Sequence, residues 1–255
     1  MLGWWRRRRR RKLRERPPPP EWEEILARRV PAAARLAPED RRELLGLMQV
    51  FLAEKHFEGC GGLALSDEIR VTIAAQACLL LLHRETDFYP DCTSILVYPH
   101  AYVAHASERL PDGTIAEGPS VRLGESWQRD VVVLSWDDVV HGASDVRDGH
   151  NVVLHEFAHQ LDQEGGTADG APALPRRSMY VAWARVLGAE YERLLERIAQ
   201  HRPTLLDPYA ATSPAEFFAV ATETFFEKPR ALRARHPELY EQLRLFYRQD
   251  PAARA

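Results

Sequence analysis

The chain has 255 residues, 45% of them hydrophobic and 28% charged, with a formal net charge of −3. This composition is typical of a globular protein that buries a sizeable core, and it excludes a fibre or a disordered chain. The longest nearly apolar run, Val71 to Leu82, falls short of the roughly 18–20 residues that span a bilayer, so we expect no transmembrane segment. The three cysteines form no CxxC pair, which indicates buried thiols rather than a disulfide framework or a thiolate zinc cluster.

The charges are unevenly distributed along the chain. Residues 1–16 carry nine Arg or Lys and one Glu, a net charge of +8, which leaves −11 for residues 17–255. An acidic body repels nucleic-acid phosphates, so we expect it to bind no nucleic acid directly. The basic start lacks the apolar segment of a signal peptide, and we therefore expect a cytoplasmic protein.

Residues 1–20 are predicted to form a disordered Arg/Pro-rich arm that ends in a stiff polyproline spacer, Pro17–Pro20. In this interpretation the arginine run is simply solvated. The alternative is a weak contact of the arm with anionic lipid or nucleic acid, in which Trp4 and Trp5 take part beside the arginines.

Residues 21–250 are predicted to form a single domain, which begins with two helices. Apolar residues follow helical spacing after Pro38, and the glycines from Gly59 onward end that segment. The second helix begins behind Ser66 as its N-cap and runs to Leu82, with a nearly all-round apolar surface that predicts burial.

Short β-branched segments then predict a small sheet. They are Ser94–Tyr98, Val121–Leu123 and Val131–Leu134, with a turn signal at Asp112–Gly113. Four further helices are expected, over Asn151–Gln163, Arg176–Gln200, Pro214–Phe226 and Pro229–Tyr247. Because helices flank the sheet without an alternating strand–helix pattern, the predicted class is α+β.

The segment His155-Glu156-Phe157-Ala158-His159 is an HExxH motif on one of these helices. Residues four apart share one face of a helix, so both imidazoles can bind a single zinc ion. Glu156 is then placed to accept a proton from a water in the metal's open position, as the general base of amide hydrolysis. The alternative is a core helix with hydrogen-bonded histidines, but three clustered polar groups are costly there without a common partner.

A catalytic zinc site needs a third protein ligand. The metzincin pattern HExxHxxGxxH is excluded, because the chain has Asp162 and Gly165 where that pattern needs Gly and His. Glu216 stands out as an acid among apolar residues near the start of a helix. Spacing leaves two roles open for it, a zinc ligand or the N3 residue of a capping box that begins at Ser213.

Several segments resemble the Mlc titration factor A (MtfA) family of zinc peptidases. They are Asn151–Asp162, Asp207–Ala211, Ala215–Val220, Gly124–Trp127 and Val133–Asp138. The arrangement of HEFxHxxD and Y-x6-E-F-F-A also resembles the catalytic domain of anthrax lethal factor. The resemblance covers most of residues 60–247 and implies a zincin-like fold, with a small sheet flanked by helices and HExxH on the active-site helix.

The resemblance also implies roles for single residues. One zinc ion per chain would be held by His155, His159 and Glu216, a gluzincin-like set. Glu156 and Tyr209 would be the catalytic residues. The phenol of Tyr209 could donate a hydrogen bond to the developing oxyanion; its alternative role is a packed aromatic with a surface hydroxyl.

Asp162, on the metal-facing stripe, has two open roles: orienting a ligand imidazole or capping the loop at residues 164–166. The remaining histidines of interest have no partner spacing and are expected to be ordinary surface or core residues; they are His100, His105, His141 and His150. By analogy with peptidases of similar geometry, Val131–Leu134 is expected to be the edge strand along which a peptide adds.

The expected function is zinc-dependent, aminopeptidase-like hydrolysis of a peptide or protein substrate. The alternative is a regulatory protein that binds and sequesters a transcriptional repressor of the Mlc type, with peptidase activity secondary. Glu156 favours the enzyme, because sequestration alone needs no general base.

Overall fold

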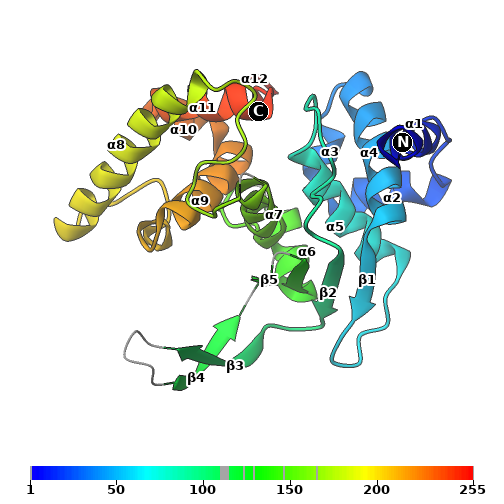
Figure 1. Cartoon of the computed structure of the whole chain (residues 1–255), viewed down its shortest axis with the longest axis horizontal. Coiled ribbons are helices and arrows are strands. Elements are labelled where there is room, and N and C mark those ends of the chain that lie inside the picture. Colours follow the sequence, from blue (N-terminus) through cyan, green and yellow to red (C-terminus); the bar gives the residue numbers. More distant parts are fainter. Residues whose placement is uncertain are drawn as a thin grey trace.

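The computed structural model describes residues 2–109, 115–122, 124–128, 130–145, 147–164 and 166–254. Its helices are α1 (Leu2–Arg14), α2 (Pro20–Arg29), α3 (Pro31–Ala34), α4 (Pro38–Glu54), α5 (Asp67–Leu79), α6 (Trp136–Ser144), α7 (Val152–Gln163), α8 (Met179–Ala199), the 3-10 helix η1 (Pro208–Ala211), α9 (Pro214–Glu227), α10 (Pro229–Arg235), α11 (Pro237–Tyr247) and α12 (Pro251–Arg254). The strands are β1 (His56–Gly59), β2 (Ser94–Tyr98), β3 (Tyr102–Arg109), β4 (Ile115–Arg122), β5 (Gly124–Gln128) and β6 (Val131–Ser135). In Figure 1, α1 to α5 gather at one end of the molecule and α8 to α12 at the other, with α7 between them.

The main sheet has the strand order β1-β2-β6-β5, in which β1, β2 and β6 are parallel and β5 runs antiparallel to β6. Strands β3 and β4 form a separate antiparallel pair. A small sheet among many helices confirms the predicted α+β class. The expected edge role of Val131–Leu134 is wrong, because β5 pairs with the free side of β6 and is itself the edge strand.

The predicted segments overlap these elements, but the helix predicted to reach Leu82 ends at Leu79, and the strand predicted from Val121 begins at Ile115. The stretch Pro229–Tyr247 is divided into α10 and α11, because Pro237 disfavours helical geometry at the residue before it. The turn signal at Asp112–Gly113 and the strand end at Leu123 lie outside the described residues. Among the cysteines, two are buried as expected and one is half-buried; the buried ones are Cys78 and Cys92, and the half-buried one is Cys60.

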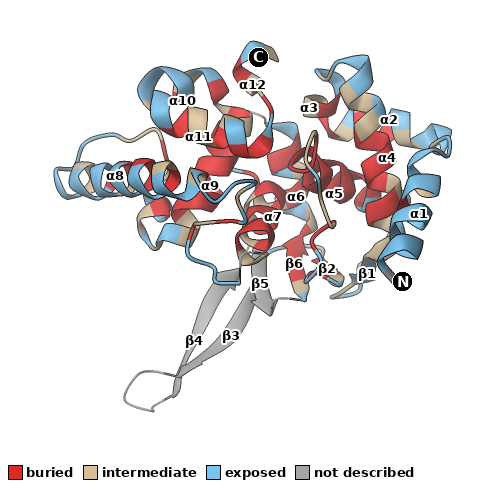
Figure 2. Cartoon of the chain, turned by 45° about the horizontal axis from the view of Figure 1, so that its top comes forward, coloured by how far each residue is buried: buried red, intermediate tan, exposed pale blue. Residues whose placement is uncertain are grey.

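The core fixes the position of α7, which packs against α5 on one side and α9 on the other (Figure 2). Helix α5 is buried over nearly its whole surface, as its sequence predicts. An aromatic cluster of Phe51, Tyr89 and Phe157 has ring centroids between 4.8 and 6.2 Å apart. Phe157 lies within the HExxH motif and is buried in this cluster. His155 and His159 lie on the opposite face of α7 and therefore point away from the cluster.

The first 20 residues differ from the expected disordered arm, because residues 2–14 form α1 and α2 begins at Pro20. A basic helix of this length is marginal in water by itself. Tertiary contacts supply the missing stability: Arg10 makes a bidentate ion pair with Glu54, at 2.9 and 2.7 Å, and Arg14 packs next to Gly46 of α4. The segment therefore packs on the body.

Candidate metal centre

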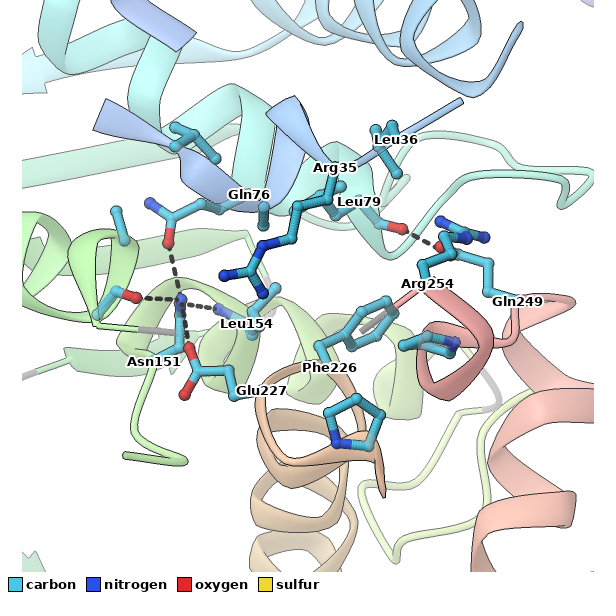
Figure 3. Close-up of a pocket in the computed structure, with 16 residues that line it drawn as sticks. Arg35, Leu36, Gln76, Leu79, Asn151, Leu154, Phe226, Glu227, Gln249 and Arg254 are labelled. Carbon is cyan, nitrogen blue, oxygen red and sulfur yellow. Dashed lines mark hydrogen bonds between the residues drawn. The ribbon is translucent and has the colours of Figure 1, made fainter. Parts of the chain in front are cut away.

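Asn151 fixes the start of α7 and so the direction of the helix that carries the motif. Its Oδ1 accepts a hydrogen bond from the backbone N–H of Leu154 at 3.0 Å, the usual N-cap contact. Its Nδ2 lies 2.9 Å from Gln76 Oε1, 3.0 Å from the carbonyl of Gly142 and 3.1 Å from Glu227 Oε1. Figure 3 shows these contacts meeting at Asn151. One buried side chain thus joins α7 to α5, α6 and α9.

Three side chains converge where α7 faces α9. The Nε2 atoms of His155 and His159 are 3.2 Å apart, and Oε2 of Glu216 lies 3.0 Å from the first and 3.4 Å from the second. Zinc bonds of about 2.0–2.2 Å in tetrahedral geometry place neighbouring ligand atoms about 3.3 Å apart. The three edges of the triangle match that separation. The same residues form the group of His, Cys, Asp and Glu side chains in the described chain that could hold a metal ion.

The carboxylate of Glu216 points at the histidines. Its Oε2 atom is buried and accepts no hydrogen bond of good geometry from the described residues. The N-cap of α9 is made by Ser213, whose Oγ accepts from the backbone N–H of Glu216 at 3.2 Å. The observed cap contact therefore uses the backbone of Glu216 and leaves its carboxylate available as a candidate metal ligand.

Glu223 lies within hydrogen-bond distance of His155, at the ring nitrogen that does not face Glu216. Its Oε1 lies 2.8 Å from Nδ1 of His155, and its Oε2 accepts from the backbone N–H of Asn151 at 2.5 Å. A carboxylate at Nδ1 fixes the tautomer that leaves Nε2 free to bind a metal. The sequence pattern alone gave Glu223 no role. Its signal was the spacing of seven residues after Glu216, which puts both acids on one face of α9.

The electrostatics of the site favour a cation between these groups. Burial would raise the pKa of Glu216, but the neighbouring His155 and His159 lower it to about 2. Burial opposes protonation of His155, yet Glu216 and Glu223 raise its pKa well above the usual value. Glu156 is buried, and burial raises the pKa of its carboxyl. The carboxylates of Glu216 and Glu223 thus stabilise positive charge at the imidazoles. The raised pKa of Glu156 makes its carboxylate a stronger base.

The other two candidate residues, Tyr209 and Asp162, differ in exposure and in their contacts. Tyr209 lies on η1 beside the site, 53% exposed, with its ring centroid 6.2 Å from that of His155. Asp162 is fully buried, and its Oδ2 accepts from the backbone N–H of Gly170 at 2.8 Å, so its observed contact is with the loop that follows α7.

Three of the remaining histidines lie at the surface, each beside an acidic side chain. Their partners are Asp137 for His100, Asp148 for His141 and Asp207 for His150. The side chain of His105 lies outside the described residues.

Known proteins match this chain over nearly its whole length. The sequence pattern of the glucose-regulated metallo-peptidase M90 family matches residues 3–248. An uncharacterised protein of Synechocystis is 44% identical over 90% of this chain and 84% of its own length. Mlc titration factor A of Serratia proteamaculans is 34% identical over 92% of this chain and 88% of its own, and that of Klebsiella pneumoniae is 34% identical over 91% and 87%. The matched residues include most of the basic segment before Pro17.

Proposed function

Because the chain belongs to the Mlc titration factor A (MtfA) family of M90 metallo-peptidases, we propose that it hydrolyses peptide bonds with one zinc ion held by His155, His159 and Glu216. The metallopeptidase class follows from the family. The observation that carries the proposed ligand set is the triangle of two Nε2 atoms and one carboxylate oxygen, with edges of 3.0 to 3.4 Å. In this proposal the fold is zincin-like, and the HExxH residues lie on its active-site helix, α7.

The protein residues around the ion have separate roles in the proposed reaction. A bound zinc ion supplies Lewis acidity that lowers the pKa of a water and polarises a carbonyl group. Glu156 accepts the proton of the attacking water and delivers it to the leaving amine, a role suited to a carboxyl whose pKa burial has raised. Tyr209, open to solvent beside His155, donates its phenol O–H to the developing oxyanion.

The decisive experiment joins metal analysis with cleavage of a peptide library. The wild-type chain is expected to hold about one zinc per chain and to cleave peptides, with the aminopeptidase-like preference that the family resemblance implies. Glu156→Gln should keep the metal and lose hydrolysis, because an amide cannot accept the proton. Glu192→Gln, at an exposed position of α8, is the matched control. Full activity of Glu156→Gln would contradict the mechanism.

A second candidate function follows from the name of the relatives, Mlc titration factor A. Under it, the chain binds and sequesters a transcriptional repressor of the Mlc type, with peptidase activity secondary. Binding of such a repressor by Glu156→Gln, at wild-type affinity, would support this candidate and show that the two activities are separable.

A further inference from the structure

The outward face of α1 carries exposed indoles and cations side by side. Trp4 and Trp5 are 59% and 62% exposed, and their rings meet edge to face with centroids 5.0 Å apart. The guanidinium of Arg8 lies over the ring of Trp4, 5.4 Å from its centroid. Arg11 and Lys12 follow on the same side of the helix at the spacing of one turn. Two large apolar rings facing water are unfavourable unless something covers them.

The opposite face of α1 is attached to the body. Arg10 is buried, pairs with Glu54 and Asp87, and lies over the ring of Phe88 at 4.7 Å. Arg6 also bonds Asp87. The inward-facing arginines of α1 thus pair with acidic side chains of the body, and these contacts hold the outward face in a fixed orientation.

The cations of the outward face have no such partners. Within the described part of the chain, no carboxylate oxygen lies within 4.0 Å of the side-chain nitrogens of Arg8, Arg11 and Lys12, or of the flanking Arg7 and Arg9. Figures 1 and 2 both show α1 at the edge of the molecule, outside α4. Charges farther away than the Debye length of about 8 Å are largely screened at physiological salt, so the cations govern the local potential despite the acidic body.

We propose that the outward face of α1, formed by Trp4, Trp5, Arg8, Arg11 and Lys12, docks on the headgroup region of an anionic phospholipid bilayer. Basic side chains near an anionic membrane each contribute about 1 kcal/mol of attraction. Indole rings partition to the membrane–water interface, where the apolar ring is covered and the N–H stays near water.

A bilayer fits this face better than nucleic acid does. Phosphates of either kind satisfy the arginines, but a duplex keeps its base faces stacked inside and leaves the two adjacent indoles uncovered, whereas the lipid interface covers them. Docking is shallow, because the outward face holds two apolar rings and no continuous apolar stripe.

The test measures binding of the full chain to vesicles of phosphatidylcholine, with and without about 30% phosphatidylglycerol, by co-sedimentation. We expect binding at least about a hundredfold stronger to the anionic vesicles, weakened by added salt. Arg8→Gln/Arg11→Gln/Lys12→Gln should lose about a hundredfold in partitioning, from three charges. Trp4→Ala/Trp5→Ala should weaken binding and remove a blue shift of tryptophan fluorescence that occurs on docking.

Matched controls separate this face from general charge effects. The triple variant Arg176→Gln/Arg177→Gln/Arg202→Gln removes three exposed cations elsewhere and should bind vesicles like the wild type. Thermal unfolding should be unchanged in all variants, because the contacts of Arg6 and Arg10 with the body remain. Equal binding to neutral vesicles, equal losses in both triple variants, or tighter binding to double-stranded DNA than to anionic vesicles at the same salt would each overturn the proposal.

Discussion

Oε1 of Glu223 on α9 lies 2.8 Å from Nδ1 of His155 on α7, so the helix that supplies the third candidate ligand also orients the first. The other oxygen of Glu223 accepts from the backbone N–H of Asn151, the residue that caps α7. One carboxylate therefore sets both the tautomer of the imidazole and the position of the helix beneath it. The site depends on the packing of α7 against α9.

Glu223→Gln should weaken zinc binding about 10- to 100-fold, as is typical when the carboxylate behind a metal-bound histidine is lost. The amide can keep one of the two contacts, but its NH₂ group then faces a donor. Competition with a chelator measures the affinity, and Glu192→Gln on the exposed side of α8 is the control. An unchanged affinity would show that Glu223 has only a structural role.

His155→Ala and His159→Ala should each lose the metal, because two remaining ligands do not hold a catalytic zinc ion. The wild type should also melt at a higher temperature with zinc than after chelation, and this difference should vanish in both variants. Metal analysis after gel filtration and thermal melts give the two readouts. His100→Ala, which changes an exposed histidine paired with Asp137, should behave like the wild type.

Glu216→Gln separates the two roles of this residue. The cap contact is donated by the backbone N–H of Glu216 to Ser213 Oγ, and glutamine leaves it intact, so any loss of stability without metal comes from the lost attraction between the carboxylate and the two histidines. Zinc affinity and turnover should both fall, since an anionic ligand is replaced by a neutral amide. Calorimetry with zinc and a peptidase assay test this. Wild-type values in both would mean that the third ligand lies elsewhere.

Asn151→Ala should lower the free energy of unfolding by about 3 kcal/mol. The substitution removes an N-cap, worth about 1 kcal/mol, and leaves buried acceptors on three neighbouring elements without their donor. Denaturant unfolding measures the change. Ser178→Ala is a matched control, because Ser178 is the N-cap residue of α8 without a side-chain cap bond. A loss below about 1 kcal/mol would show that the three contacts of Asn151 Nδ2 contribute nothing beyond the N-cap.

Stability should fall as the pH rises from about 4.5 to about 9. Burial raises the pKa of Glu227 from 4.5 to about 9, so in this window the folded chain holds a proton that the unfolded chain has released. The slope of one such group approaches about −1.4 kcal/mol per pH unit. Glu227→Gln mimics the protonated carboxyl and should flatten the pH dependence of denaturant unfolding. Parallel curves for the variant and the wild type would contradict this assignment.

The sequence determined the parts of this protein that rest on local pattern. Helical spacing, N-caps such as Ser66 and β-branched runs predicted α5, α7, α8, α9, β2 and β6 near their observed bounds, because side chains four apart on a helix or two apart on a strand share a face. The pairing of His155 with His159 follows from the same periodicity. These features depend on residues that are neighbours along the chain.

Only the tertiary structure decided what residues far apart in sequence do together. Glu216 could be a cap or a ligand by spacing, and the packing of α9 on α7 brings its carboxylate to both imidazoles. Glu223 gains its role from the same packing. The basic start of the chain reads as a solvated arm, yet Arg10 finds Glu54 and Asp87, 44 and 77 residues away, and becomes buried. Ion pairs over such separations leave no periodic signal in the sequence, because loops of any length can close them at a small additional entropic cost.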